Sequence, residues 1–456
     1  MAGGKYSMTP VDVPAVDTQY RKIRTPLPVP ESLPIFEELA RYEPVSMQGQ
    51  PPVVWDSASD FQVHDAWGNT WLDWSSGVLI TNSGHGHPEM VGAIQRIIDK
   101  PLLATYCFAH EGRARLTKML AERAPADLDK VFLVSTGSEA TENCIKLAKT
   151  WGREQAGPQK NVFITFVNTF HGRTMGAQTA GGMAGGKVWI GDLDPTFVQV
   201  PFPDGFKNEN TDFSLFESTL ADAGINPTEV AGVMSETYQG VGPDFMPTEY
   251  AQQLRKWCDD CGALLIFDEV QAGFGRTGTY WGFEHYGITP DLIACGKGIS
   301  GALPLAAVIG RGDVMNLYSP GSMTSTHSAS PVAVASAIAN LEVIDKQNLV
   351  QNAATLGQAL ATGLNEIQQT CPQRLGCVRA RGLVGGIQIV KPGTRTPDPD
   401  TAFLINESCF HKGLLMFAPV GISGECIKIS PPLTTPQSAL EEGLEVLAEV
   451  CAEVLD

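Results

Sequence analysis

Short apolar runs recur through the middle of the chain, from about residue 79 to residue 344. Most of them are separated by segments long enough for a helix or a loop, a pattern typical of a largely parallel sheet covered by helices. The runs that we predict as buried strands are 131–134, 162–166, 230–234, 264–267, 292–294 and 306–309. The pattern therefore predicts an α/β fold with one large domain over residues 79–344.

The two ends of the chain differ from this middle part. The first 50 residues are rich in proline and contain one candidate helix around 33–41, whereas residues 51–78 alternate and turn like a small β-meander. After residue 344, Leu356, Leu360 and Leu364 mark one face of an amphipathic helix, followed by a strand near 386–390 and a final helix. We expect three parts: 1–78 as an arm with part of a small domain, 79–344 as the large domain, and 345–456 as an α+β small domain.

Composition narrows the class of protein. At 456 residues and 43% apolar content the chain has enough material for a large core. Its formal charge of -18 argues against nucleic acid or an anionic membrane as a partner, because binding phosphate requires clustered Lys and Arg. The N-terminus lacks a signal-peptide pattern, and the ten cysteines lack framework spacing. We expect a soluble cytoplasmic protein. We also expect no metal, because Cys258 and Cys261 have no second cysteine pair to complete a zinc site.

One glycine-rich segment raises the hypothesis of a dinucleotide site. Gly273, Gly275 and Gly278 have the spacing G-x-G-x-x-G, which in dinucleotide-binding folds directly follows a strand and opens a helix. Four residues separate the predicted strand from Gly273, and the sequence after Gly278 has no helical period. We therefore rank nicotinamide binding last among the hypotheses.

Asp268 and Lys297 are the stronger candidates for chemistry. Asp268 ends a predicted buried strand, and Lys297 lies between two glycines just after another. Pyridoxal phosphate requires an amine to hold its aldehyde as an imine, and a carboxylate to keep its pyridine nitrogen protonated. Taken singly, each residue is more often structural, a surface lysine or a capping aspartate. Their combination favours a site for this cofactor.

Two further segments fit the same cofactor. Residues 135–140, Ser-Thr-Gly-Ser-Glu-Ala, follow a predicted strand and lead into a predicted helix. The N-terminus of a helix presents free N–H groups and a positive dipole end to a phosphate. Phe170 follows the strand 162–166, where an aromatic ring could stack on a planar cofactor or simply pack in the core.

Six motifs, in order along the chain, resemble those of the class III aminotransferases of subgroup II, the ornithine or ω-amino acid type. They are GHGHP, STGSEA, FHGRT, DEVQAGFGRTG, GKGISGALPLAAV and THSASP, and the resemblance covers about residues 50 to 435. It implies the fold-type I PLP-dependent transferase fold, with a mostly parallel, seven-stranded type of sheet in its large domain. It also implies a homodimer, or a dimer of dimers, with active sites shared between subunits.

The resemblance implies roles for individual residues. Lys297 would be the Schiff-base lysine and general acid-base, and Asp268 the partner of the pyridinium nitrogen. Val270 would pack on the ring face opposite Phe170, and either Gln271 or Glu236 would lie near the 3-oxygen of the ring. The remaining cofactor residues implied are Gly137 and Ser138 at the phosphate, His171 beside the ring, and Thr326 reaching the neighbouring subunit's phosphate.

Two departures from the family pattern concern the substrate. The motif E-P-x-Q-G-E-G reads here ETYQGVG, so Val241 stands where relatives often have a second glutamate. The motif R-x-x-P-P-L begins here with Lys428, where most relatives place an arginine for the α-carboxylate of the substrate. Lysine lacks the two-pronged fit of a guanidinium, so we expect weaker or rearranged carboxylate recognition, unless Lys428 points to solvent. Tyr106 is a further candidate substrate residue.

These features predict an aminotransferase that moves an amino group from a terminal amine or ω-amino acid to pyruvate or 2-oxoglutarate by a ping-pong mechanism. Another PLP-dependent reaction on the same scaffold stays open: a phospho-lyase, a decarboxylating transaminase or an aminomutase, since the fold does not fix the reaction. A non-catalytic protein that retains the fold is disfavoured by intact Lys297 and Asp268.

Overall fold

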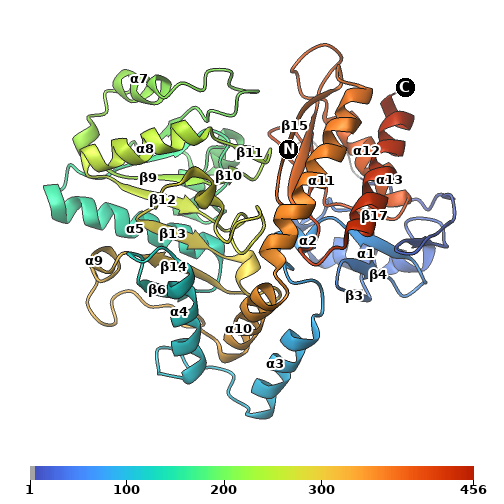
Figure 1. Cartoon of the computed structure of the whole chain (residues 1–456), viewed down its shortest axis with the longest axis horizontal. Coiled ribbons are helices and arrows are strands. Elements are labelled where there is room, and N and C mark those ends of the chain that lie inside the picture. The colour runs from blue at the N-terminus through green and yellow to red at the C-terminus, as the bar shows by residue number, and fades with distance from the viewer. Residues whose placement is uncertain (1–5, 456) are drawn as a thin grey trace. The chain divides into compact units, whose positions relative to one another are not determined.

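The computed structural model describes residues 6–455 and divides into two compact units. We call the unit built from Pro88–Val350 the central unit, and the one built from the described residues of Met1–His87 and Gln351–Asp456 the terminal unit. The sequence analysis expected boundaries after residues 78 and 344. Both precede the boundaries between the units, which follow His87 and Val350. In Figure 1 the terminal unit contains both the dark blue and the red elements, because it is built from segments near the two ends of the chain.

A seven-stranded mixed sheet forms the core of the central unit. Its strands are β6 (Lys130–Val134), β7 (Val162–Phe166), β8 (Phe197–Val200), β9 (Val230–Glu236), β12 (Leu264–Asp268), β13 (Leu292–Cys295) and β14 (Ala306–Gly310). Their order across the sheet is β6-β14-β13-β12-β9-β7-β8, and β14 alone runs antiparallel to its neighbours. This confirms the predicted α/β class and mostly parallel sheet.

All six predicted strands lie in this sheet, and β8 is the one that the sequence analysis missed. β8 is a four-residue edge strand, three of whose residues are only half-buried. A short, half-exposed edge strand carries little hydrophobic signal, whereas β9 and β12 are buried along their whole length.

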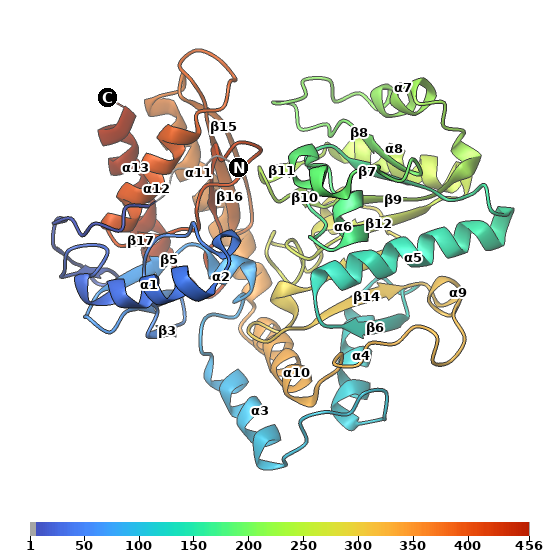
Figure 2. The same cartoon turned by 180° about the vertical axis from the view of Figure 1, so that it is seen from behind.

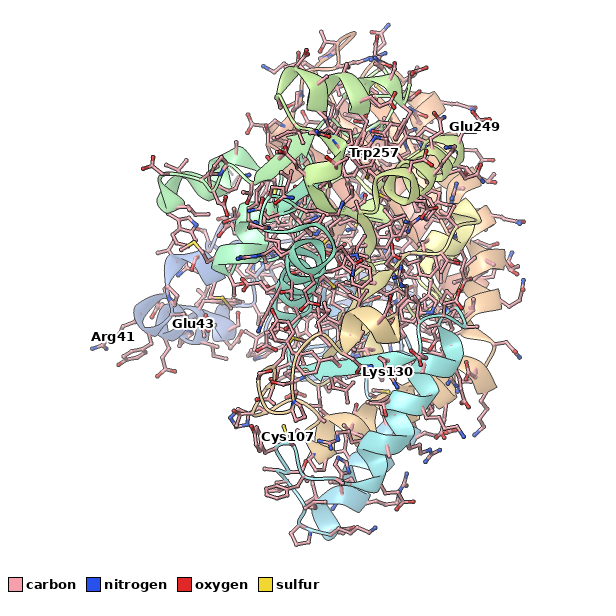
Figure 3. The ribbon with its side chains drawn as sticks, turned by 90° about the vertical axis from the view of Figure 1, so that its left-hand side faces the viewer. Arg41, Glu43, Cys107, Lys130, Glu249 and Trp257 are labelled. Carbon is pink, nitrogen blue, oxygen red and sulfur yellow. The ribbon has the colours of Figure 1, made fainter. Side chains whose placement is uncertain are left out.

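Helices surround the sheet. α5 (Gly137–Ala156) packs across β9, β13 and β14 and buries the small or apolar face that contains Ala140, Cys144 and Ala148 (Figure 2). α8 (Thr248–Cys261) packs against β9 and β12, and its Trp257, labelled in Figure 3, meets the ring of Phe216 on α7 (Ser214–Asp222) edge to face. The other helices of the unit are α3 (Pro88–Asp99), α4 (Glu111–Arg123), α6 (Met175–Ala180), α9 (Gly312–Met315) and α10 (Pro331–Lys346).

The terminal unit contains two small sheets. One has the order β1-β2-β5-β4-β3 with β17 paired to β5, and the other the order β15-β16-β18. Their strands are β1 (Val16–Asp17), β2 (Lys22–Ile23), β3 (Ser57–Ser59), β4 (Gln62–His64), β5 (Thr70–Asp73), β15 (Leu375–Arg381), β16 (Val384–Ile389), β17 (Leu414–Leu415) and β18 (Cys426–Ile429). The meander expected in residues 51–78 is β3, β4 and β5, and the expected strand near 386–390 is β16.

The helices of the terminal unit include those that the hydrophobic pattern predicts. α1 (Leu33–Tyr42) is the expected N-terminal helix, and α11 (Leu349–Thr370) buries Leu356, Leu360 and Leu364. The others are α2 (Ser76–Leu79), α12 (Pro399–His411) and the final helix α13 (Gln437–Leu455). No helix in residues 6–455 is both long and apolar enough to cross a membrane.

Candidate active site

The predicted functional segments of the central unit meet at one edge of its sheet. The parallel strands β7, β9, β12 and β13 end at this edge, and β6, which is antiparallel to β14, ends there too. Glu236 at the end of β9 is the register partner of Asp268 at the end of β12. Side chains that are far apart in the sequence are therefore neighbours here, at the edge where open α/β sheets bind ligands.

Asp268 is held by two hydrogen bonds at the end of β12. Its Oδ2 lies 2.7 Å from Nδ1 of His171, and its Oδ1 accepts a 3.0 Å bond from the backbone N–H of Val270. The residue is only 5% exposed. A buried strand end and two fixed contacts leave this carboxylate little freedom to turn.

His171 joins Asp268 to a second buried carboxylate. Its Nε2 lies 3.1 Å from the hydroxyl of Thr169, which donates a 2.8 Å hydrogen bond to Oε2 of Glu236. Glu236 also accepts backbone N–H groups from Phe170, at 2.9 Å, and from Gly240, at 3.0 Å. Burial raises the pKa of the Glu236 carboxyl; the nearby His171 opposes this rise and Asp268 adds to it.

Lys297 follows β13 at the same edge. Burial lowers the pKa of its amine, and the negative charges of Asp268 and Glu236 partly oppose that shift. Its backbone has a φ of 45°, in the left-handed region that costs a non-glycine residue about 1–2 kcal/mol. Strain at the one residue whose amine faces both carboxylates is the kind of feature that clusters at functional sites.

The N-terminus of α5 forms an anion cradle. Thr136 caps the helix in a capping box with Glu139, whose side chain accepts the N–H groups of Ser135 and Thr136. Within residues 6–455, the N–H groups of Gly137 and Ser138 have no hydrogen-bond acceptor. These are the groups that a phosphate would accept from at a helix N-terminus.

Glycines keep the space beside this cradle open. A Cβ at Gly137 would lie 2.9 Å from Cγ1 of Val270, and one at Gly296 would lie 3.5 Å from the same atom. The first turn of α5 is also tied to the segment after β7, because the Thr141 hydroxyl donates to the backbone oxygen of His171 at 2.8 Å. Gly137, Val270 and the residue before Lys297 are thus neighbours.

This arrangement fits pyridoxal phosphate on three observations of the structure. The cradle offers free N–H groups, the strand end offers a buried carboxylate, and the 3₁₀ turn Lys297–Ile299 offers an amine with a lowered pKa. No group of three His, Cys, Asp or Glu side chains in the described part of the chain could hold a metal ion.

The prediction that either Gln271 or Glu236 lies near the 3-oxygen of the cofactor ring stays open between the two residues. Gln271 lies against Gly240, where a Cβ would approach its Nε2 to 2.6 Å, while Glu236 accepts two backbone N–H groups and the Thr169 hydroxyl. Phe170 is half-buried, and the guanidinium of Arg173 lies 5.9 Å from its ring centroid. Its stacking role stays a prediction.

The three candidate substrate residues, and the cofactor candidate Thr326, come from separate segments of the chain. Val241 is buried in the turn between β10 (Tyr238–Gln239) and β11 (Asp244–Phe245). Tyr106 and Thr326 are exposed, and the Tyr106 hydroxyl lies 3.3 Å from that of Thr324. Lys428 belongs to β18 of the terminal unit and is only 2% exposed, so the alternative that it points to solvent is wrong.

The glycine segment 273–278 does not open a helix. Turns and bends follow β12, and the next regular element is the short 3₁₀ helix Gly282–Tyr286. The expectation that the dinucleotide condition is unmet is therefore confirmed. Glu269, which follows Asp268 directly, accepts the N–H groups of Gly282 and Phe283 at 2.8 and 3.0 Å and so fixes this loop.

The sequence analysis missed Thr169 and Glu269. Thr169 gives no signal of its own, because a threonine after a strand is common in turns and its two partners are distant in the sequence. Glu269 directly follows Asp268 and was not selected as a candidate. Its complete burial is the signal that only the structure supplies.

Comparisons with known proteins agree with this geometry. The family described as "Aminotransferase class-III" matches residues 45–451. The 5-aminovalerate aminotransferase DavT of Pseudomonas putida is 33% identical over 415 residues, which cover 88% of this chain and 94% of that protein. The 4-aminobutyrate aminotransferase GabT of Escherichia coli is 32% identical, with 87% and 93% covered. A solved amine transaminase from an uncultivated Pseudomonas species, in its PLP-bound form, is 27% identical with a TM-score of 0.81, covering 88% and 95%.

Proposed function

The chain belongs to the PLP-dependent class III aminotransferases, and from that premise we propose that it takes an amino group from a terminal amine or ω-amino acid and gives it to pyruvate or 2-oxoglutarate. One observation carries the proposal: Lys297, Asp268 and the open N-terminus of α5 lie at the same edge of one sheet. The donor class follows the names of the two relatives above, which act on 5-aminovalerate and 4-aminobutyrate.

Different residues of the site would bind different parts of the cofactor. Gly137 and Ser138 would donate their free N–H groups to its phosphate, and Asp268 would accept a hydrogen bond from its ring nitrogen and so keep that nitrogen protonated. Val270, beside Gly137, would cover one face of the ring and Phe170 the other. When bound, pyridoxal phosphate supplies an aldehyde that takes up amino groups and a ring that withdraws electrons from the adjacent carbon.

Lys297 would act as the general base. An ammonium cannot accept a proton, so the amine is competent only if its pKa falls toward the working pH, as burial provides here. Its Nζ would remove the proton from the carbon that carries the donor's amino group, and would return a proton in the second half-reaction. Asp268 and Glu236 retain the resulting ammonium close to the sheet edge.

The two departures from the family pattern bear on the substrate. Val241 is buried and uncharged where relatives often have a glutamate, so it would leave the substrate region more apolar. Lys428 would supply the positive charge for a carboxylate in place of the family's arginine, with one ammonium instead of a two-pronged guanidinium. Both changes favour donors whose binding depends less on a carboxylate next to the amine.

A second copy of the chain is part of the proposal. Exposed apolar side chains gather on α3 and in the segment that follows it, near Cys107 in Figure 3. They are Val91, Ile98, Leu102, Leu103 and Phe108, the last of them 77% exposed. Large exposed apolar groups close together mark interaction surfaces, and Thr326 would reach the phosphate of the neighbouring subunit. Sedimentation of the holoenzyme as a monomer at micromolar concentration would contradict this part.

A panel of donors tests the function. Simple terminal amines, 4-carbon and 5-carbon ω-amino acids and ornithine are each supplied with pyruvate or 2-oxoglutarate, and oxo acid and amine are both quantified. We expect one oxo acid consumed for each amine, with the highest kcat/KM for a donor whose amine is terminal. Amine loss without oxo acid consumption would instead indicate the lyase alternative.

A further inference from the structure

Four buried groups form one hydrogen-bonded chain at the sheet edge. It runs from Asp268 Oδ2 to His171 Nδ1 (2.7 Å), from His171 Nε2 to Thr169 Oγ1 (3.1 Å), and from Thr169 Oγ1 to Glu236 Oε2 (2.8 Å). All four residues are at most 5% exposed. The chain thus connects two carboxylates through an imidazole that is 3% exposed and a hydroxyl residue that is 1% exposed.

The direction of these bonds fixes where the protons are when both carboxylates are ionised. An ionised carboxylate only accepts, and a threonine hydroxyl has one proton to donate. Since Thr169 donates that proton to Glu236, its oxygen must accept from Nε2 of His171. Asp268 must accept from Nδ1. Both ring nitrogens then carry protons, and His171 is an imidazolium.

A second arrangement satisfies the same contacts. If Glu236 is protonated, its O–H donates to Thr169, the Thr169 hydroxyl turns to donate to Nε2, and neutral His171 keeps its Nδ1 proton on Asp268. The two arrangements contain the same number of protons. From the second arrangement to the first, one proton moves from Glu236 to Thr169 while another moves from Thr169 to His171. The net result is that one positive charge moves from Glu236 to His171. Burial raises the pKa of Glu236, which makes its protonated form accessible.

We propose that Thr169 is a positioning residue that relays a proton between Glu236 and His171, and thereby sets whether Asp268 faces a charged or a neutral imidazole. Charged groups near the relay include the amine of Lys297 and, beyond Asp268, the carboxyl of Glu269. In the first arrangement, the imidazolium of His171 lies between two ionised carboxylates. A protonated ring nitrogen at Asp268 adds a cation, and the relay lets His171 give up its charge to Glu236.

This inference goes beyond the proposed function, because it does not depend on the donor or the acceptor. It predicts that His171 has protons on both nitrogens in the cofactor-free protein and on Nδ1 alone after PLP is bound. The two states differ in the ¹⁵N chemical shift of Nε2, because an imidazole nitrogen without a proton resonates far from one with a proton.

The test is ¹⁵N NMR of the full-length protein labelled at its eight histidines, with and without PLP. The His171 signals are assigned by their loss in His171→Gln. Thr169→Val replaces the hydroxyl by a methyl group of similar size, and Thr169→Ser restores it. Thr165→Val is the matched control, since the buried Thr165 hydroxyl donates to a backbone oxygen, that of Ala180, and takes no part in the chain.

We expect the Nε2 shift to change on PLP binding in the wild type, in Thr169→Ser and in Thr165→Val, and to be lost in Thr169→Val. The Kd for PLP should rise about tenfold in Thr169→Val and stay within about twofold in the other two, as for one lost hydrogen bond. An unchanged Nε2 shift in the wild type, or a change that persists in Thr169→Val, overturns the proposal. So does its loss in Thr169→Ser, which decides the matter even if the valine variant does not fold.

Discussion

A buried aspartate–histidine pair lies in each compact unit, and the oxygen–nitrogen distances in the two pairs are nearly the same. In the central unit Asp268 Oδ2 lies 2.7 Å from His171 Nδ1, and in the terminal unit Asp73 Oδ2 lies 2.6 Å from His85 Nε2. Both aspartates end strands, β12 and β5, and all four side chains are buried. The pair itself therefore does not identify an active site.

The surroundings of the two pairs differ. Asp73 uses its other oxygen on Ser75, accepting the backbone N–H at 2.7 Å and the hydroxyl at 2.6 Å, while the backbone of His85 exchanges two hydrogen bonds with Asp60. These contacts lie within one meander and the loop that follows it, so the pair closes that loop. In the central unit the pair joins segments that follow β7, β9 and β12, and an amine from beyond β13 faces it.

This comparison shows what distinguishes a functional pair from a structural one. Both aspartates accept a backbone N–H from two residues further along the chain, but only the Asp268 pair leads on to a second carboxylate and to Lys297. The following experiments separate the two kinds of pair and then refine the difference.

Lys297→Ala should have the largest effect. Removing the amine on which Asp268 and Glu236 act removes both the attachment point and the general base, so kcat should fall about 10⁴-fold or more. PLP should still bind noncovalently, and circular dichroism should be unchanged. Lys187→Ala is the matched control, because Lys187 is another lysine of the central unit whose pKa burial lowers. It should lower Tm and leave kcat within about threefold; wild-type turnover in Lys297→Ala would refute the assignment.

The same substitution in the two pairs comes next. Asp268→Asn removes the charge that would keep the ring nitrogen protonated, and should lower kcat about 10²- to 10³-fold with little change in Tm. Asp73→Asn should do the opposite: it should destabilise the fold by about 1.5–3 kcal/mol, as for a hydrogen bond to a charged group, and leave kcat within about threefold. Equal losses of turnover in both variants, measured at saturating PLP, would contradict the distinction drawn here.

How far the sequence alone leads can be judged on these residues. Asp268 and Lys297 could be found because each follows a continuous apolar run, and β12 and β13 are buried along their whole length. The helix N-terminus at Gly137 was readable from its glycine and capping residues. The pairing of His85 with Asp73 could not be predicted, because a contact between side chains on different segments leaves no local pattern in the sequence. Thr169 and Glu269 were missed for the same reason.

The pH dependence of stability tests a third acid, Glu269, which lies next to Asp268 but faces away toward its own loop. Burial raises the pKa of the Glu269 carboxyl to about 7. The hydrogen bonds from Thr237 and from the N–H groups of Gly282 and Phe283 oppose this rise. The folded protein therefore binds more protons than the unfolded chain between about pH 4.5 and pH 7, and this contribution to stability is lost as pH rises through that window. The loss amounts to about 3 kcal/mol for this one group.

Glu269→Gln should remove that dependence. An amide does not ionise, so the free energy of unfolding of the variant should fall less steeply from pH 5 to pH 8. Urea unfolding at several pH values measures the slope. An identical slope in the wild type and Glu269→Gln would show that Glu269 does not titrate in this range.

Lys428→Ala should have the smallest effect, and one that depends on the substrate. Lys428 is only 2% exposed and belongs to β18 of the terminal unit, where we expect it to attract a carboxylate and not to move a proton as Lys297 does. Losing one charge-assisted contact should raise KM about tenfold for carboxylated donors, and within about twofold for simple amines, with kcat nearly constant for both. Lys428→Arg should lower KM for carboxylated donors, because a guanidinium binds a carboxylate at two points. If both donor classes respond equally to the alanine variant, the lysine supports β18 and the carboxylate is bound elsewhere.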